Sequence, residues 1–124
     1  MTDEIRTFPG GATRDIDKDK LDYEGFLCPL VLERYAIFMH GKRLQNDGEY
    51  RSSDNWQRGI PKSEYMKSGW RHFHAWWANH RTGEVIEEDD LCALMFNVMG
   101  YLHETLKDNR DVPSTTDRLY VLAE

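Results

Sequence analysis

The stretch from Glu87 to Lys107, EEDDLCALMFNVMGYLHETLK, constrains the fold of this chain more than any other. It opens with four acidic residues and continues as about four turns of helical pattern. Its larger apolar residues recur at the spacing of one helix face, which predicts a helix with a buried apolar stripe. These residues are Leu91, Leu94, Met95, Val98, Met99, Leu102 and Leu106.

A second line of side chains follows the same predicted helix. Asp90, Asn97 and Glu104 lie seven residues apart, and Ala93 and Gly100 leave space beside them. In one interpretation the acidic residues cap the helix and complement its dipole, while the polar line faces water. In the other, the helix belongs to a bundle and carries a functional site.

The composition is that of one globular domain. The chain has 124 residues, of which 40% are hydrophobic, and we expect a single domain over 1–124. Within it we expect an arm at 1–25, a helical core at 26–107 and a C-terminal tail at 108–124. The four Trp, six Tyr and five Phe residues favour a well-filled interior or an aromatic pocket.

The charge and the two cysteines restrict the function and the compartment. A net charge of −6 argues against general nucleic-acid binding, which depends on cations that neutralise phosphates. No apolar run reaches the length of a membrane span, so no membrane partner is expected. Cys28 and Cys92 lie in apolar runs and are typical of reduced residues in a cytoplasmic protein.

Residues 26–41 predict the first helix, with Pro29 in its first turn and Gly41 at its end. The helix is apolar almost all round, which is typical of a buried helix. Glu33 would then lie at low dielectric, where an unpaired carboxylate is costly. It would be protonated, bound to a cation, or paired in a salt bridge, for which Arg71 is a candidate.

Two polar segments could bring cations to a site. Residues 1–25 predict an extended arm without a stable helix, and this arm is either a solvated leader or a source of cations such as Arg14 and Lys18. Residues 42–60 predict a long loop, which in a small domain is often functional. Lys42 opens this loop and contributes to its local positive charge.

Residues 61–80 predict the second helix, again opened by a proline. Trp56, just before it, either anchors the loop to the core or stacks on a base. His72 lies at the edge of the helix's apolar stripe and is either a structural residue or part of a site. That stripe is expected to form the core and comprises Tyr65, Met66, Gly69, Trp70, Phe73, Trp76 and Trp77.

The residues with the clearest potential for chemistry are carboxylates on the predicted helices. No Ser/His/Asp order, Cys/His pair, phosphate-binding Gly-rich loop or zinc spacing is present. Glu87 and Asp90 lie one turn apart on one helix, and Glu33 lies on another. Oxygen ligands from two packed helices suit Mg²⁺ or Mn²⁺, which bind substrate phosphates through one or two carboxylates.

The order of several short motifs resembles a known family. The motifs are GGATRD (10–15), LERYAIFMHGKR (32–43), DNWQRGIP (54–61), RH followed by AWW (71–77), GE (83–84) and an acid-opened helix containing FN (96–97). Together they resemble the phage-associated dATP/dGTP diphosphohydrolase N-terminal-like domain family, which is related to the MazG-type all-α nucleotide pyrophosphohydrolases.

The resemblance implies an all-α helical bundle that forms a homo-oligomer, a dimer or tetramer. It implies hydrolysis between the α and β phosphates of a nucleoside triphosphate with Mg²⁺ or Mn²⁺. Glu33, Glu87 and Asp90 would then be the catalytic metal-binding carboxylates, with Asn97 and His72 in or beside the metal shell. The chain departs from related sequences in having Ala93 where a second histidine is common.

The resulting hypothesis is a pyrophosphohydrolase that converts a purine nucleoside triphosphate (dGTP, GTP or dATP) to the monophosphate and pyrophosphate. Arg14, Lys18 and Lys42 would bind phosphates, and Asn55 and Trp56 would recognise the base. The expected location is the cytoplasm, or the host cytoplasm if a phage encodes the chain. The alternative is a non-catalytic helical module that binds a protein partner through an aromatic surface.

Overall fold

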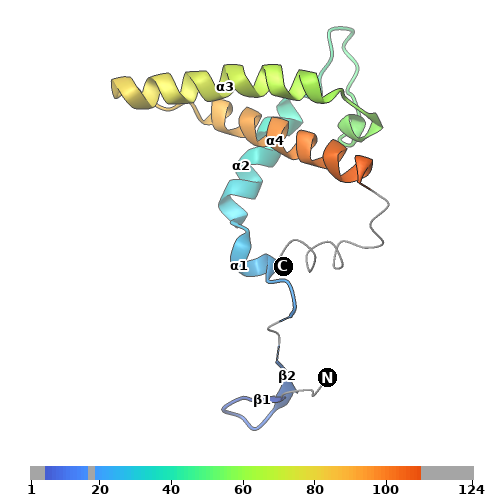
Figure 1. Cartoon of the computed structure of the whole chain (residues 1–124), viewed down its shortest axis with the longest axis vertical. Helices are drawn as coiled ribbons and strands as arrows, with labels where there is room; N and C mark the ends of the chain where they lie inside the picture. Colours follow the sequence, from blue (N-terminus) through green and yellow to red (C-terminus); the bar gives the residue numbers. More distant parts are fainter. Residues whose placement is uncertain (1–4, 17–18, 110–124) are drawn as a thin grey trace. The chain divides into compact units, whose positions relative to one another are not determined.

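A computed structural model describes residues 5–16 and 19–109 of the chain (Figure 1). The chain divides into two compact units, Met1–Leu32 and Glu33–Glu124, which are described separately below. The described elements are β1 (Ile5–Thr7), β2 (Thr13–Asp15), α1 (Tyr23–Phe26), α2 (Pro29–Gly41), η1 (Asn55–Arg58), α3 (Lys62–Thr82) and α4 (Glu88–Asp108).

The N-terminal unit contains a small hairpin that the sequence did not predict. Strands β1 and β2 pair antiparallel, with Arg6 opposite Arg14. The connection closes because the N–H of Phe8 donates to the carbonyl of Ala12 and Gly11 adopts a φ of 89°. Glycine reaches this left-handed region without steric cost, which is why a turn forms there.

The expectation that the arm contains no helix is wrong at its C-terminal end, at Tyr23–Phe26. A short helix, α1, follows the hairpin because the carboxylate of Asp22 accepts a hydrogen bond from the N–H of Gly25 at 2.8 Å. This side chain satisfies an N–H group that a helix start otherwise leaves without a partner. The arm was predicted from its polar composition, and composition does not indicate a hairpin or a helix cap.

Helix α2 begins at Pro29, three residues after the predicted start, and ends at Gly41 as predicted. The expectation that it is buried is wrong, because none of its residues is buried within this chain. Ile37 is 61% exposed, and the side chain of Glu33 is also exposed. Glu33 therefore lies in water and needs no buried partner, and no ion pair joins it to Arg71 within the described residues.

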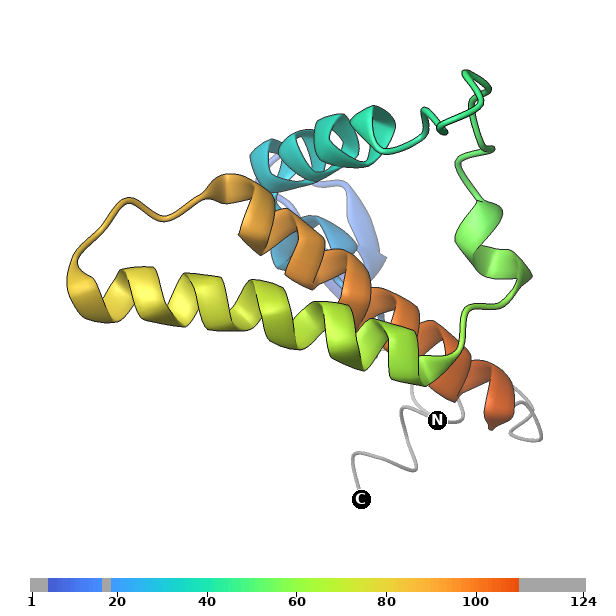
Figure 2. The ribbon, with the colours of Figure 1, turned by 90° about the horizontal axis from the view of Figure 1, so that it is seen from above.

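The centre of the C-terminal unit is the pair of α3 and α4, which run back along each other (Figure 2). Pro61 precedes α3, and Gly83 ends it with a left-handed φ of 74°. The acids that open α4 complement its dipole, although Glu87 at the cap position makes no hydrogen bond through its side chain.

The two helices contact each other through small residues of α4 together with Tyr65 and Gly69 of the α3 stripe, whereas most of the larger residues of the two stripes lie outside the contact. On α4 the buried residues are Cys92, Ala93, Asn97 and Gly100. The ring of Tyr65 on α3 is 3% exposed and lies over Gly100, whose missing side chain makes this contact possible. The buried face of α4 is thus the predicted polar line with its small neighbours, and Asn97 does not face water.

Both predicted apolar stripes are consequently at the surface, apart from Tyr65 and Gly69 and the partly buried Leu91 and Leu94. On α3, Trp70 is 60% exposed and Trp77 is 50% exposed. On α4, Val98 is 60% exposed and Leu102 is 53% exposed. The prediction that these stripes form the core of the chain is wrong for the chain taken alone, because close packing on small residues turns the larger ones outward.

The expected all-α class and the long loop between α2 and α3 are confirmed, with the two-stranded sheet as an addition. No described helix is both long and apolar enough to cross a bilayer. The predicted tail falls outside the described residues from 110 onward, and the single-domain organisation stays a prediction.

Candidate functional site

A cavity of about 490 Å³ lies within the C-terminal unit. Side chains from α2, the long loop, η1, α3 and α4 line it, so segments distant in sequence meet there. Among the predicted site residues, five line this cavity: Lys42, Asn55, Trp56, His72 and Asn97. A cavity of this size can accommodate a small-molecule ligand.

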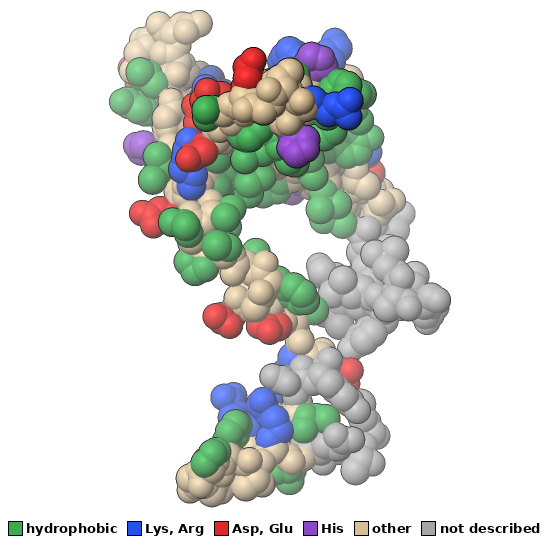
Figure 3. Space-filling model, turned by 90° about the vertical axis from the view of Figure 1, so that its left-hand side faces the viewer, with side chains coloured by type: hydrophobic (Ala, Val, Ile, Leu, Met, Phe, Trp, Pro, Cys, Tyr) green, Lys and Arg blue, Asp and Glu red, His purple; other side chains and the backbone are tan. Residues whose placement is uncertain are grey.

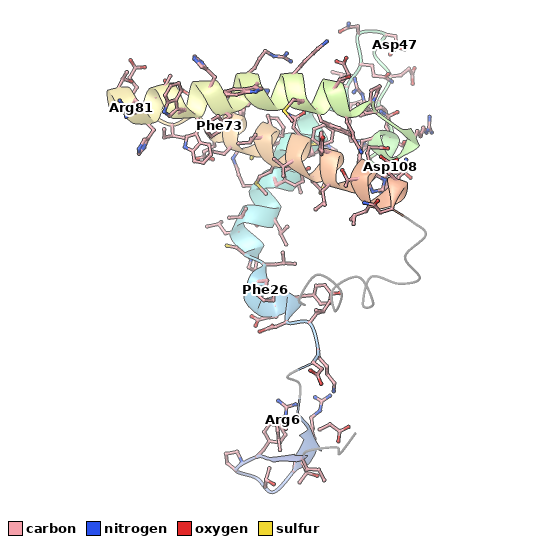
Figure 4. The ribbon with its side chains drawn as sticks, in the orientation of Figure 1. Arg6, Phe26, Asp47, Phe73, Arg81 and Asp108 are labelled. Carbon is pink, nitrogen blue, oxygen red and sulfur yellow. The ribbon has the colours of Figure 1, made fainter. Side chains whose placement is uncertain are left out.

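One wall is a basic loop folded as a small hairpin. Leu44 and Tyr50 form an isolated antiparallel bridge. Next to it the N–H of Arg51 donates to the carbonyl of Arg43 at 2.8 Å, and Nε of Arg43 donates to the carbonyl of Arg51 at 2.9 Å. These bonds hold the two arginines side by side at the hairpin base, and both line the cavity. Figure 4 labels Asp47 in the same loop.

Polar groups that accept or donate hydrogen bonds adjoin this basic wall. Ser52 and Ser53 follow Arg51 directly and also line the cavity, as does Lys42 at the end of α2. The ammonium of Lys42 lies 5.2 Å from the centre of the Phe38 ring, which holds it over an aromatic face. Arginine, lysine and serine donors grouped in this way suit a phosphate-bearing ligand.

Another part of the lining is an oriented imidazole, held by a carboxylate that does not itself line the cavity. Nδ1 of His72 on α3 lies 2.8 Å from Oδ1 of Asp90 on α4. The side chain of Asp90 is 20% exposed, and that of His72 is 33% exposed. Because the carboxylate accepts the proton of Nδ1, Nε2 of the neutral ring is left as an acceptor. Oδ2 of Asp90 is the carboxylate oxygen that this contact does not use.

Asn97 lies in the same wall and is 6% exposed. Its Nδ2 donates to the carbonyl of Ala93 at 2.8 Å and to Oγ of Ser68 at 3.1 Å. A carbonyl can only accept a hydrogen bond, so this contact fixes the orientation of the amide. The Oδ1 atom therefore serves as the acceptor of a side chain that lines the cavity.

An aromatic group completes the lining. Trp56 in η1 packs edge-to-face on His103, with ring centroids 4.8 Å apart and an angle of 72°. Asn55 precedes it, and Phe96 of α4 lines the cavity as well. Trp56 is therefore anchored by a contact to α4, as one of the two interpretations expected, and it is also part of the cavity wall. Its stacking on a base stays a prediction.

The remaining acidic residues lie away from the cavity lining. Arg34 of α2 donates through Nε to Glu88 at 2.6 Å and through its Nη2 to Asp89 at 2.8 Å. The hydrogen bonds with Asp89 and then Glu88 raise the pKa of Arg34 above its ordinary value. This pairing joins α2 to the start of α4. Neither Glu33 nor Glu87 lines the cavity.

Within residues 5–16 and 19–109, no three His, Cys, Asp or Glu side chains are grouped closely enough to hold a metal ion. His72 and Asp90 form a pair, with Asn97 nearby on α4, and this is a partial set of donors. The metal-binding roles predicted for Glu33 and Glu87 stay predictions. So does the role of Arg14, which lies in β2, while Lys18 falls outside the described residues.

Several residues of the cavity wall were not among the predicted site residues. Arg43, Arg51, Ser52, Ser53 and Ser68 all contribute to it. The positive charge and turn-forming composition of the loop were visible in the sequence, and they could have identified the first four. Ser68 gave no signal, because only the pairing of α3 and α4 brings it to Asn97.

Comparison with protein families gives one match that covers most of the chain. The model of the family described as dATP/dGTP diphosphohydrolase, N-terminal, matches residues 11–113. Searches among curated proteins and among solved structures found no match. The matched region includes every described residue of the cavity and, apart from Gly10, the motifs that carried the resemblance. The chain therefore belongs to the dATP/dGTP diphosphohydrolase N-terminal domain family.

Proposed function

We propose that this chain is a nucleotide diphosphohydrolase that cleaves a purine nucleoside triphosphate, dGTP, GTP or dATP, to the monophosphate and pyrophosphate. The observation that carries the proposal is the cavity itself, which combines a basic wall at Arg43 and Arg51 with an oriented imidazole at His72. Family membership supports the class of reaction, and the name of the family supports a purine deoxynucleotide.

The basic wall would bind the polyphosphate of the substrate. Lys42, Arg43 and Arg51 supply positive charge, and Ser52 and Ser53 supply hydroxyl donors. Charge-assisted hydrogen bonds to phosphate are stronger than those between neutral groups. In an acidic chain of net charge −6, this concentration of cations is what would attract a polyanion to the cavity.

The aromatic wall would receive the base. Trp56 offers a ring held by His103, and Asn55 offers an amide that can both donate and accept hydrogen bonds. Stacking on an aromatic ring tolerates different bases, so discrimination between guanine and adenine would depend on the polar groups beside it.

The imidazole wall would act at the scissile phosphate. Asp90 would keep the His72 ring in the tautomer whose Nε2 accepts a proton, which allows it to accept a proton from an attacking water molecule. Asn97 would present Oδ1 beside it. Both groups are held by hydrogen bonds before substrate arrives, so little reorganisation is required.

A divalent cation, Mg²⁺ or Mn²⁺, is part of the proposal. Oδ2 of Asp90 and the amide oxygen of Asn97 would supply oxygen donors to such an ion, with His72 beside the shell as the proton acceptor, and substrate phosphates commonly complete the shell. Glu33 and Glu87 remain proposed additional ligands. When bound, the ion would offset the charge of the polyphosphate and polarise the phosphorus under attack.

Two features of the cellular setting accompany this proposal. Because its substrate would be a free nucleotide, we propose the cytoplasm as its location, or the host cytoplasm for a phage-encoded chain. We also propose a homo-oligomer, because the side chains expected to form the core are exposed in one chain.

The test is a nucleotide panel with the purified chain in Mn²⁺ and, separately, Mg²⁺. We expect pyrophosphate release from at least one of dGTP, GTP and dATP, loss of that release with EDTA, and a higher melting temperature with the preferred nucleotide. If no nucleotide releases pyrophosphate and none raises the melting temperature, the enzyme proposal fails. The non-catalytic binding module, which the exposed Trp70 and Trp77 favour, then becomes the better candidate.

A further inference from the structure

The hydroxyl of Ser68 is a polar group of the cavity to which the proposed reaction assigns no role. Ser68 lies on α3, is partly buried, and lines the cavity together with His72. The two residues are four apart in sequence, so they lie one turn apart on the same face of the helix. Much of the surface that these helices expose is hydrophobic (Figure 3), whereas both described α3 residues that line the cavity are polar.

The oxygen of Ser68 accepts a hydrogen bond from the neighbouring helix. Nδ2 of Asn97 donates to Oγ of Ser68 at 3.1 Å and to the carbonyl of Ala93 at 2.8 Å. The carbonyl can only accept, so it fixes which end of the amide carries the protons. In the contact with Ser68 the amide is therefore the donor and the hydroxyl oxygen is the acceptor. The hydroxyl proton of Ser68 takes no part in this contact.

The proton of the Ser68 hydroxyl is not used within α3 either. A hydroxyl inside a helix can donate to the carbonyl four residues earlier. Thr82 of α3 makes this bond at 3.0 Å, and Thr105 of α4 makes it at 2.9 Å. Ser68 does not, because in the part of the chain that the structure describes the contact from the amide is its only hydrogen bond. Its proton is available to a ligand in the cavity.

The chemistry around Ser68 favours an anionic acceptor for this proton. A hydroxyl that already accepts a hydrogen bond is a stronger donor, because successive hydrogen bonds polarise one another. Arg43 and Arg51 line the same cavity, and their positive charge attracts anions. A phosphate oxygen accepts hydrogen bonds, and its charge strengthens them. A phosphate group therefore matches a donor hydroxyl that shares a cavity with arginines.

We propose that Ser68 is a phosphate-binding residue. Asn97 holds the oxygen of Ser68, and the hydroxyl of Ser68 donates a hydrogen bond to a phosphate oxygen of the ligand, beside His72. The assignment rests on the proposed function for the identity of the ligand, a nucleoside triphosphate. Asn97 then has two tasks, because its Nδ2 orients Ser68 while its Oδ1 stays available to a cation.

The affinity of the full chain for inorganic tripolyphosphate tests this proposal. Isothermal titration calorimetry in EDTA measures binding of the polyanion without turnover. Ser68→Ala should weaken binding by about tenfold or more, the usual effect of losing a hydrogen bond to a charged group. Ser68→Thr keeps a hydroxyl at the same position and should restore most of the affinity. Circular dichroism checks that both variants keep their helices.

Two further variants serve as controls. Ser63→Ala removes an exposed serine of α3 that does not line the cavity, so it should leave the affinity unchanged. Asn97→Ala removes the amide that orients Ser68. In that background Ser68→Ala should weaken binding by less than about threefold, because the two side chains act as a unit and their effects are not additive.

Three results would overturn the assignment. These are an unmodified chain that does not bind tripolyphosphate, equal affinities in Ser68→Ala and Ser63→Ala, and a threonine variant that binds as weakly as the alanine variant. Failure of the proposed function is a separate result. Tripolyphosphate binding that requires the Ser68 hydroxyl, without pyrophosphate release from any nucleotide, would support the phosphate-binding role and remove the enzyme. Nucleotide turnover with the same KM and kcat in Ser68→Ala would do the reverse.

Discussion

Nδ1 of His72 on α3 and Oδ1 of Asp90 on α4 lie 2.8 Å apart, so a hydrogen bond joins the two long helices at the edge of the cavity. This contact changes the interpretation of the acids that open α4. Glu88 and Asp89 bind Arg34, whereas Asp90 faces the other way and orients an imidazole. The four consecutive acids therefore do not act as one group.

The first prediction concerns Asp90. Asp90→Asn should reduce nucleotide turnover by roughly 10–100-fold, the usual effect of losing a carboxylate that orients an imidazole. The fold should be unaffected, because asparagine occupies the same volume and is favourable near the start of a helix. Asp89→Asn is the control, since Asp89 is exposed and contacts Arg34 instead. Pyrophosphate release and circular dichroism provide the measurements. Equal turnover in the two variants would return Asp90 to a structural role.

The second prediction concerns the basic wall. Arg51→Ala should raise KM for the triphosphate about tenfold or more, because a charge-assisted hydrogen bond to phosphate contributes about 1.5–3 kcal/mol. The hairpin should persist, because Arg51 contributes to it through backbone atoms.

Arg81→Ala is the control for this change. Arg81 lies in the last turn of α3, at the end of the helix away from the loop that carries Asp47 (Figure 4). It does not line the cavity, so its removal should leave KM unchanged. A similar increase of KM in both arginine variants would mean that overall charge, and not the cavity, attracts the nucleotide.

The third prediction compares two glycines in the helix pair. At Gly100 an added Cβ would overlap the ring of Tyr65, so Gly100→Ala should lower the free energy of unfolding by about 1–3 kcal/mol. At Gly69 the nearest atom to an added Cβ is Cβ of Asn97 at 3.6 Å, an ordinary contact. Gly69→Ala should therefore be neutral or stabilising by up to about 1 kcal/mol, because alanine favours helix. Urea unfolding of the two variants measures the difference, and equal effects would contradict the packing described here.

The fourth prediction concerns the hydroxyl of Tyr65, which is buried without a hydrogen-bond partner. Such a group costs about 1–3 kcal/mol, so Tyr65→Phe should keep or raise the stability at neutral pH. Burial, and then the charge of Glu104, raises the pKa of Tyr65 above its ordinary value of 10.0.

The pH dependence of stability follows from the direction of that shift. Above pH 10 the unfolded chain loses the Tyr65 proton before the folded chain does, so stability falls as pH rises toward the folded pKa. The phenylalanine variant lacks this contribution, and its advantage over the unmodified chain should grow between pH 9 and about pH 11. Thermal unfolding across this range provides the test. A constant difference between the two proteins would show that the tyrosine is not held in its neutral form.

The sequence by itself determined the helices and their limits. Gly41 ends α2 as predicted, although Pro29 rather than Phe26 begins it, and the periodic stretches gave α3 and α4 to within a few residues, because these signals are local. It also indicated a basic loop, a tryptophan within it and a histidine at the edge of a stripe, all of which line the cavity.

Only the tertiary structure decided which helix faces meet. Periodicity identifies an apolar face but not the surface that covers it, and here small residues at Ala93 and Gly100 form the contact with α3. That choice buries Asn97, brings Asp90 to His72 and leaves Val98 exposed. Glu33 lies in water because the apolar helix that carries it, α2, is not covered within one chain.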